Sequence, residues 1–407
     1  MDMNQTPSGN RVHISLFGKR NAGKSSVMNA LVGQQHSIVS DVKGTTTDPV
    51  LKSMELLPLG PVIFTDTPGL DDDGQLGAFR MEKSYQVLDK TDVALVVVDS
   101  SCGIAHEDQR IIERIREKQI PYVVVFNKHD LIPNHTIEEV DVSKLLKEAK
   151  EGKEIRIWIS TVDNYHIQEL KELLSQLQPD MEPQIPIIAD LVKPKDLVVL
   201  VVPIDKAAPK GRLILPQQQT IRELLDVGAV PVVTRETELQ ATLEQFKQPP
   251  AFVVTDSQVF EEVSRIVPDS IPLTSFSILF ARHKGVLQPA LEGVKVLKQL
   301  KDKDTVLIAE GCTHHRQCGD IGTEKIPNWI QGQLGDAEVY FEYCSGNDFP
   351  RDLSAYRLVI QCGGCMLNEQ EVKYRYHLAE EQGIPMTNYG IAISEMKGIL
   401  SRSVARL

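Results

Sequence analysis

Short runs of β-branched and other apolar residues alternate along the chain with longer stretches in which apolar residues recur every three to four positions. The short runs predict strands, which in the first part of the chain fall at residues 12–17, 62–66, 93–99, 122–127 and 156–160. The longer stretches predict helices, at residues 25–32, 77–90, 107–118, 142–150 and 167–177. This alternation predicts an α/β fold with a doubly wound, mostly parallel sheet.

Prolines interrupt the alternation near residues 179–186 and again at Pro268 and Pro272. Between these breaks the pattern predicts strands and helices at 197–202, 217–225, 230–233, 236–246, 252–255 and 257–266. After the second break it predicts elements at 274–283, 305–309, 358–361 and 369–381 and a terminal helix from Ile391. We therefore expect three domains, at residues 1–180, 183–268 and 269–407, the last two being smaller α/β domains.

Composition and charge narrow the class of protein. Hydrophobic residues make up 42% of the 407 residues, which is enough apolar mass for several globular cores. The formal net charge of −12 argues against nucleic acid as the main partner, since neutralising phosphates needs a basic face. The polar first ten residues do not resemble a signal peptide, and no apolar run is long enough to cross a membrane. We expect a cytoplasmic protein whose six cysteines are thiols or metal ligands.

A glycine-rich segment, Gly-Lys-Arg-Asn-Ala-Gly-Lys-Ser at residues 18–25, follows a predicted strand and opens a predicted helix. In that context the loop turns backbone N–H groups toward phosphates, and the helix N-terminus adds its positive end. Lys24 is placed to reach the β- and γ-phosphates, and the Ser25 hydroxyl to ligate Mg²⁺. The alternative is an ordinary strand–helix turn with a chance lysine.

Two further segments follow predicted strands and complete a GTP site. In Asp-Thr-Pro-Gly, Asp66 can hold Mg²⁺ through water, and the N–H of Gly69 can sense the γ-phosphate. In Asn-Lys-His-Asp, spanning Asn127, Lys128 and Asp130, the final carboxylate can accept N1–H and N2–H of guanine. Adenine offers no such pair of donors, so an unpaired carboxylate would reject it.

These segments resemble the translation-factor-type GTPases, in particular the branch related to Era and the tRNA-modification GTPase MnmE. The resemblance implies that Thr46, in the Gly-Thr-Thr-Thr-Asp segment at 44–48, binds Mg²⁺ and closes over the γ-phosphate. It implies catalytic roles for Lys24, Thr46, Asp66 and Gly69. The nucleotide-binding residues that it implies are Gly18, Asn21, Ala22, Gly23, Lys24, Ser25, Ser26, Asn127, Lys128, Asp130, Ser160 and Thr161.

Two positions bear on how such an enzyme would hydrolyse GTP. Asn21 stands where this branch uses an asparagine to help hold a monovalent cation, usually K⁺, against the phosphates. Leu70 stands where Ras-like enzymes place the glutamine that orients water. Because leucine cannot orient water, we expect slow intrinsic hydrolysis that depends on the cation or on a partner.

Five of the six cysteines lie in the last hundred residues. One predicted strand there leads into Cys312-Thr-His314, and another leads into Cys362-Gly-Gly-Cys365. Ligand sites in α/β sheets lie at this end of strands, and the intervening glycines let two thiolates converge. Three thiolates and an imidazole suit zinc as well as an iron–sulfur cluster, and residue types do not decide between them. The alternative is a set of buried, inert thiols. Cys102, Cys318 and Cys344 lack the spacing of metal ligands, and we expect them to be core or spare thiols.

The domain order, the Cys-x-His, a gap of 47 residues and the final Cys-x-x-Cys resemble the HydF family of [FeFe]-hydrogenase maturation GTPases over the whole chain. The resemblance implies a [4Fe–4S] cluster bound by Cys312, Cys362 and Cys365. The candidates for the fourth ligand are His314, His315, Glu310 and water. It further implies a homodimeric scaffold that receives a di-iron precursor made with radical-SAM maturases and delivers it to apo-[FeFe]-hydrogenase. The alternatives are a ribosome- or tRNA-associated GTPase with a structural zinc, and a GTP-switch adaptor whose cysteines only stabilise the fold.

Overall fold

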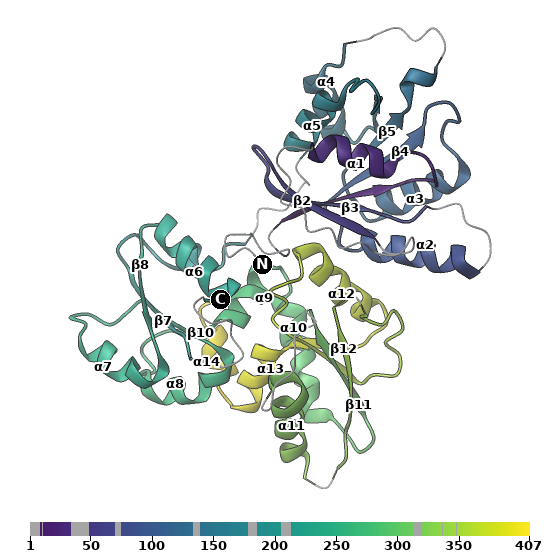
Figure 1. Ribbon diagram of the computed structural model, residues 1–407. Helices are drawn as coiled ribbons and strands as arrows, with labels where there is room; N and C mark the ends of the chain where they lie inside the picture. Colours follow the sequence, from purple (N-terminus) through teal and green to yellow (C-terminus); the bar gives the residue numbers. More distant parts are fainter. Residues whose placement is uncertain are drawn as a thin grey trace. The chain divides into compact units, whose positions relative to one another are not determined.

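The structure is a computed structural model that describes residues 9, 11–33, 49–69, 75–132, 139–177, 185–204, 213–311, 320–335, 337–346 and 348–407. The chain divides into two compact units, residues 1–182 and 183–407. In Figure 1 the first unit runs from purple to blue-green and the second from teal to yellow. Each unit has its own sheets and is described separately.

The first unit is built on a six-stranded sheet in the order β2-β3-β1-β4-β5-β6. All neighbouring strands are parallel except β2, which pairs antiparallel with β3 at one edge. The strands are β1 (Val12–Phe17), β2 (Val50–Leu56), β3 (Gly60–Asp66), β4 (Val93–Asp99), β5 (Tyr122–Asn127) and β6 (Ile155–Trp158). The helices are α1 (Lys24–Val32), α2 (Gln75–Leu88), α3 (His106–Glu117), α4 (Val142–Lys150), α5 (Ile167–Gln176) and the short η2 (His129–Leu131).

Helices cover both faces of this sheet (Figure 1). Along β4, Leu95 and Val97 enter a core shared with α1 and α5, whereas Ala94 and Val96 enter a second core shared with α2 and α3. A parallel strand that is buried on both faces has no polar positions, which explains the uninterrupted apolar run of β4. The predicted doubly wound sheet is confirmed.

The second unit contains two four-stranded parallel sheets, in the orders β10-β9-β7-β8 and β12-β11-β13-β14. Their strands are β7 (Leu197–Val201), β8 (Val230–Thr234), β9 (Phe252–Thr255), β10 (Leu273–Ser275), β11 (Thr305–Glu310), β12 (Tyr340–Ser345), β13 (Leu358–Gln361) and β14 (Met386–Asn388). The helices are α6 (Leu215–Asp226), α7 (Leu239–Glu244), α8 (Phe260–Ile266), α9 (Phe276–His283), α10 (Leu287–Val294), α11 (Ile326–Leu334), α12 (Glu369–Glu381), α13 (Tyr389–Met396) and α14 (Leu400–Val404). Short 3-10 or π turns are η3 (Ala189–Leu191), η4 (Glu236–Glu238), η5 (Ser257–Val259), η6 (Lys295–Gln299) and η7 (Ile321–Lys325).

The two sheets of the second unit share one continuous hydrophobic core. Val201 and Val253 of the first sheet belong to the same buried cluster as Leu307 and Val359 of the second. Leu273 of β10 pairs with Val253 of β9, so the first of these sheets includes a strand beyond the domain boundary expected at residues 268–269.

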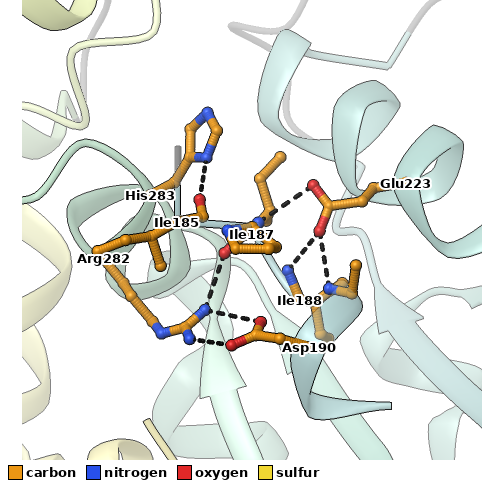
Figure 2. Close-up of polar contacts among 9 residues, drawn as sticks. Ile185, Ile187, Ile188, Asp190, Glu223, Arg282 and His283 are labelled. Atoms are coloured by element: carbon orange, nitrogen blue, oxygen red, sulfur yellow. Dashed lines mark hydrogen bonds and ion pairs between the residues drawn. The ribbon is translucent and has the colours of Figure 1, made fainter. Parts of the chain in front are cut away.

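The chain enters the second unit along α6, where one carboxylate binds three consecutive backbone groups (Figure 2). The Oε2 atom of Glu223 accepts the N–H of Ile187 at 3.1 Å, and Oε1 accepts the N–H groups of Ile188 at 2.8 Å and Ala189 at 2.7 Å. Hydrogen bonds to a charged acceptor are stronger than neutral ones, so this segment is firmly attached to α6.

The end of α9 holds the same segment from another direction (Figure 2). The Nη1 atom of Arg282 donates to the carbonyl of Pro186 at 2.8 Å, and the guanidinium forms a bidentate ion pair with Asp190. The Nδ1 atom of His283 lies 2.6 Å from the carbonyl oxygen of Ile185. We call Glu223, Arg282 and His283 the entry clamp.

Within the described ranges, every helix is too short or too polar to cross a lipid bilayer.

Candidate nucleotide site and cysteine site

The glycine-rich loop joins the end of β1 to the start of α1, as the sequence predicts. Gly23 has a φ of +95°, and a Cβ atom added there would lie 2.2 Å from Nδ2 of Asn127. The same Asn127 amide donates to the carbonyl of Ala22 at 3.1 Å. Only glycine fits between the phosphate loop and the end of β5, because a larger residue would push the two apart.

Lys24 and Ser25 begin α1 and connect the loop to β3. The Lys24 ammonium is buried and donates to the carbonyl oxygens of Gly18 at 2.9 Å and Lys19 at 2.8 Å. The Ser25 hydroxyl donates to Oδ2 of Asp66, the last residue of β3. Burial raises the pKa of the Asp66 carboxyl, while the Ser25 hydrogen bond and the Lys24 charge act against this shift.

The Ser25 and Asp66 oxygens fit a magnesium ion. Both are hard oxygen donors of the kind that Mg²⁺ prefers, and the second carboxylate oxygen, Oδ1 of Asp66, is buried without a hydrogen-bond partner among the described residues. Gly69 lies against the phosphate loop, because a Cβ atom on it would lie 2.9 Å from the backbone nitrogen of Arg20. Thr46 and Leu70, which the sequence assigns to the same region, lie outside the described residues.

The expected guanine-binding residues lie together at the ends of β5 and β6. Ser160 is fully buried, and its hydroxyl donates to Oδ1 of Asp130 at 2.7 Å. Asp130 itself is exposed, which leaves its carboxylate accessible to a ligand. The Lys128 backbone is in the left-handed region, and its ammonium pairs with Asp99 at 2.6 Å. The serine therefore orients the carboxylate that the sequence assigns to base recognition, and Thr161 follows in the same loop.

The Cys-Gly-Gly-Cys segment begins where β13 ends, beside the end of β11. Gln361 pairs with Ala309, and the N–H of Cys362 donates to the Ala309 carbonyl at 2.8 Å. The Sγ atom of Cys362 accepts two backbone N–H groups, from Gly311 at 3.0 Å and Gly364 at 3.4 Å. Cys362 and Cys365 are free, half-buried thiols.

Burial is the largest cause of the pKa shifts at this site. Burial raises the pKa of both thiols, although the Gly311 and Gly364 N–H groups lower that of Cys362 and the Lys284 charge lowers that of Cys365. Burial likewise lowers the pKa of the Lys284 ammonium, and the two thiolates oppose that shift.

Cys312 and His314 lie outside the described residues, as do His315 and Cys318. Cys312 directly follows Gly311 in the sequence, whose N–H reaches the Cys362 sulfur. Among the residues that the structure describes, no group of three or more possible metal ligands comes together. Glu310, named as a possible ligand, is buried and accepts the Tyr389 hydroxyl at 3.4 Å.

Of the other described cysteines, Cys344 lies near the Cys-Gly-Gly-Cys segment, since it pairs with Ala309 of β11 and the Cys362 thiolate helps to raise its pKa. Cys102 is an exposed free thiol of the first unit. Cys344 is a half-buried free thiol of β12 that packs against the core, and burial raises its pKa to about 11.

Three family models match the chain in succession. Residues 13–128 match the 50S ribosome-binding GTPase family. Residues 187–285 match the hydrogen maturase F dimerization domain, and residues 288–406 match the hydrogen maturase F tetramerization domain. The chain has the architecture of the hydrogen maturase F (HydF) family. The resemblance drawn from the cysteine pattern and the domain order is therefore confirmed.

Curated relatives of this HydF-type chain are GTPases. GTPase Der of Wolinella succinogenes is 32% identical over 46% of the chain and 39% of its own length. GTPase Era of Thermoanaerobacter sp. strain X514 is 28% identical over 54% of the chain and 73% of its own length. The tRNA modification GTPase MnmE of Chromobacterium violaceum is 42% identical over 30% of the chain and 26% of its own length. The chain thus spans less than half of the Der and MnmE relatives, and its first unit is a P-loop GTPase domain.

Two buried cations in the HydF-type region escaped the sequence analysis. Lys284 follows Arg282 and His283 at the end of α9, where basic residues usually face solvent and interact with the helix dipole. Its burial depends on packing that no local pattern reveals. The burial of Arg375 could have been predicted, because it lies three residues after Val372 and four before Ala379, both on the buried face of α12.

Proposed function

We propose that this chain is a GTP-hydrolysing scaffold of [FeFe]-hydrogenase maturation that binds a [4Fe–4S] cluster in its C-terminal region. In this proposal it assembles or carries a di-iron precursor, made with radical-SAM maturases, and delivers it to the apo-hydrogenase. The observation that carries the proposal is the pair of free thiols at the end of β13, next to the end of β11, in a chain with HydF architecture. We assign GTP hydrolysis to the domain expected at 1–180, dimerisation to 183–268 and the cluster to 269–407.

The residues at the cysteine site fit the cluster. Cys362 and Cys365 are unpaired and close in sequence, and Cys312 is the next residue after a backbone group that touches the Cys362 sulfur. Backbone N–H groups that point at sulfur stabilise thiolate ligands and tune cluster potentials. When bound, a cluster with three thiolate ligands has one iron free to take an exchangeable ligand, and His314 or Glu310 are the candidates in this chain.

In the GTPase domain, the proposed roles belong to the segments that follow β1, β3, β5 and β6. Lys24 holds the β- and γ-phosphates, Ser25 and Asp66 hold Mg²⁺ together with Thr46, and the N–H of Gly69 senses the γ-phosphate. Asp130, oriented by Ser160, accepts the two guanine donors. These roles require no large rearrangement of the described loops, since the ends of β1, β3, β5 and β6 lie at one edge of a parallel sheet.

Asn21 is the residue proposed to hold K⁺. It is exposed at the tip of the phosphate loop, with a left-handed φ of 62°. Turnover measured in KCl and NaCl at equal ionic strength tests the role with screening held constant. We expect faster hydrolysis in KCl, and Asn21→Ala should remove the difference. Equal rates of the unmodified chain in KCl and NaCl would contradict this role, and nothing would then replace the water-orienting glutamine of Ras-like enzymes.

We propose that the homodimer forms through β8, the open edge of the first sheet in the second unit. β10, at the opposite edge, is buried, whereas Val230 and Val233 of β8 are 48% and 47% exposed. An exposed apolar edge strand is a template for pairing with another strand, and the dimerization-domain match spans it. Val233→Lys should yield monomers in light scattering, while Val162→Lys, at an 80% exposed site of the first unit, should not. A Val233→Lys variant that stays dimeric would exclude this edge.

The deciding experiment is anaerobic purification followed by iron, sulfide and zinc quantification. We expect close to four irons and four sulfides per chain, and Cys312→Ala, Cys362→Ala and Cys365→Ala should each abolish them while GTP hydrolysis continues. Stoichiometric zinc without sulfide would favour the structural-zinc alternative. If the unmodified chain contains no metal and the cysteine variants unfold, the alternative of a GTP-switch adaptor, whose cysteines only stabilise the fold, would be favoured.

A further inference from the structure

Lys284 ties the end of α9 to the cysteine loop. The side chain is 9% exposed, and its ammonium donates to the carbonyl oxygens of Gly364 at 2.6 Å and Leu367 at 3.0 Å. Both bonds are buried. No ion pair joins this ammonium to a carboxylate of the described ranges, although the charges of Glu369 and Glu371 act on it from a greater distance. Two of its three N–H groups are therefore used on carbonyls that flank Cys365, and its charge is not neutralised by a direct partner.

These two bonds fix the course of the cysteine loop from one side. On the other side, the Cys362 sulfur accepts the N–H of Gly311, and a Cβ on Gly311 would lie 2.7 Å from Leu367. The loop from 362 to 367 is thus held between α9 and the end of β11. A loop held at both ends presents its two thiols in one arrangement, which a metal group needs in order to bind without reordering the chain.

Arg375 is the second buried cation at this end of the sheet. Its side chain is 1% exposed, and one nitrogen, Nη2, donates to the Gly346 carbonyl and to Glu371, each at 2.7 Å. Nε and Nη1 are buried with no partner among the described residues. The N–H of Gly346 in turn donates to the carbonyl of Glu310 at 2.9 Å, so Arg375 lies where β11 ends. The guanidinium also lies over the Phe349 ring, 4.8 Å from its centroid, and its two unpaired buried donors can bind acceptors that a ligand supplies.

We propose that Lys284 and Arg375 are positioning residues of the cysteine site: Lys284 fixes the 362–367 loop, and the two buried cations together hold an anionic, thiolate-ligated group. The inference rests on the proposed function, since thiolates and sulfides make a bound iron–sulfur group anionic. A buried anion requires compensating charge or hydrogen bonds, and the described part of the site supplies Lys284 and, although it is also paired with Glu371, Arg375. The charge of Arg375 also lowers the pKa of Cys362 and of Cys344, although burial outweighs it at both.

The test compares Lys284→Met and Arg375→Met with Lys295→Met, a control in which the substituted lysine is 62% exposed. The full-length variants are reconstituted anaerobically with ferrous iron and sulfide, and folding is checked by circular dichroism and GTP hydrolysis. Two readouts follow: the midpoint potential of the bound group, titrated by EPR, and the rate at which a chelator removes iron. We expect both site variants to have a more negative potential, because a compensating positive charge is lost, and to lose iron about tenfold faster. Lys295→Met should match the unmodified chain.

One further variant separates the loss of charge at residue 375 from the loss of packing. Arg375→Lys keeps the charge that Arg375→Met removes, and we expect its potential to lie closer to that of the unmodified chain. Site variants that bind iron and sulfide with unchanged potential and unchanged release rate would overturn the inference while leaving the proposed function intact. An unmodified chain that takes up no iron–sulfur group would overturn both.

Discussion

The nucleotide site and the cysteine site leave buried polar atoms of opposite kind without partners. Among the described residues of the nucleotide site, the unpaired buried atoms include two acceptors, Oδ1 of Asp66 and Oδ1 of Asn127. At the cysteine site the unpaired charged atoms are donors, Nε and Nη1 of Arg375, with the Lys284 ammonium buried nearby. One neutral acceptor, Oε1 of Gln361, is unpaired there as well. Since most buried polar groups have partners, the difference agrees with the proposals of a magnesium ion at the first site and an anionic group at the second.

The two sites also differ in whether the sequence reveals the residues that form them. The nucleotide site is formed by loops that each follow a strand of one sheet, and their residues can be recognised as motifs. The cysteine loop is held by Lys284, which lies 80 residues before Gly364 in the sequence. Local sequence motifs thus identify the residues of the first site, whereas the contact that holds the cysteine loop depends on tertiary packing. The four predictions below test that contrast.

The largest expected effect is at Gly23. In Gly23→Ala the new Cβ would lie 2.2 Å from the Asn127 amide, which is buried and bonded to Ala22. We expect nucleotide affinity to fall more than ~100-fold, about 3 kcal/mol, with iron and sulfide content unchanged. Fluorescent-nucleotide titration measures the first and elemental analysis the second. Gly33→Ala is the matched control, because Gly33 also has positive φ but has nothing within 4 Å of its Cβ position.

The next effect is at the guanine-recognition carboxylate. Asp130→Asn replaces an acceptor of two hydrogen bonds with an amide that presents a mismatched donor, so GTP binding should weaken by roughly 2–3 kcal/mol. Xanthosine triphosphate, which offers an acceptor in place of the guanine amino group, should bind the variant better than GTP does. A variant that still prefers GTP would show that base recognition lies elsewhere.

A smaller effect is expected at the entry clamp, where the second unit again depends on contacts between distant segments. Glu223→Ala leaves the N–H groups of Ile187, Ile188 and Ala189 without their acceptor. We expect the second unit to lose roughly 2 kcal/mol of stability, measured by urea denaturation followed by tryptophan fluorescence and circular dichroism. Glu381→Ala, which removes a 59% exposed carboxylate from α12, should change stability by less than about 0.5 kcal/mol. Equal midpoints for the two variants would contradict the role of Glu223.

The smallest effect concerns Asp108, a buried carboxylate of α3 in the first unit. Burial raises its pKa, against the Ala105 N–H that donates to it. The folded chain therefore holds this proton more tightly than the unfolded chain, so the stability contributed by Asp108 falls as the pH rises from 3.8 through the raised value. Asp108→Asn should be more stable than the unmodified chain at pH 7, by on the order of 1 kcal/mol, and no more stable below the unfolded pKa. A stability difference that does not change with pH would contradict this assignment.

The strands that the sequence predicts best are those buried on both faces. β4 and β5 begin and end where the apolar runs do, because parallel strands buried on both faces are nearly continuous in apolar residues. β1 also has the predicted limits, although it contains His13 and Ser15. β2 escaped prediction because it is an edge strand, mostly half-exposed, in which Lys52 and Glu55 interrupt the apolar pattern. β10 and β14 escaped for a different reason, since they are only three residues long.

In the candidate sites, too, some features could be predicted from the sequence and others could not. The positions of Lys24, Asp66 and Asp130 at strand ends could be predicted, because parallel strands place their following loops at one edge. The hydrogen bond from Ser160 to Asp130 agrees with the loop expected from the GTPase resemblance. Lys284 could not be predicted, because its role depends on which loop lies opposite the end of α9.

The position of the entry clamp has a mechanical consequence. The first described residues of the second unit, from Ile185 onward, are held by Arg282 and His283, and the next residue along the helix end, Lys284, holds the cysteine loop. Tension applied to the chain at residue 185 is therefore borne by side chains adjacent to the one that shapes the thiol loop. A force that displaced the end of α9 would pull directly on the carbonyl groups on either side of Cys365.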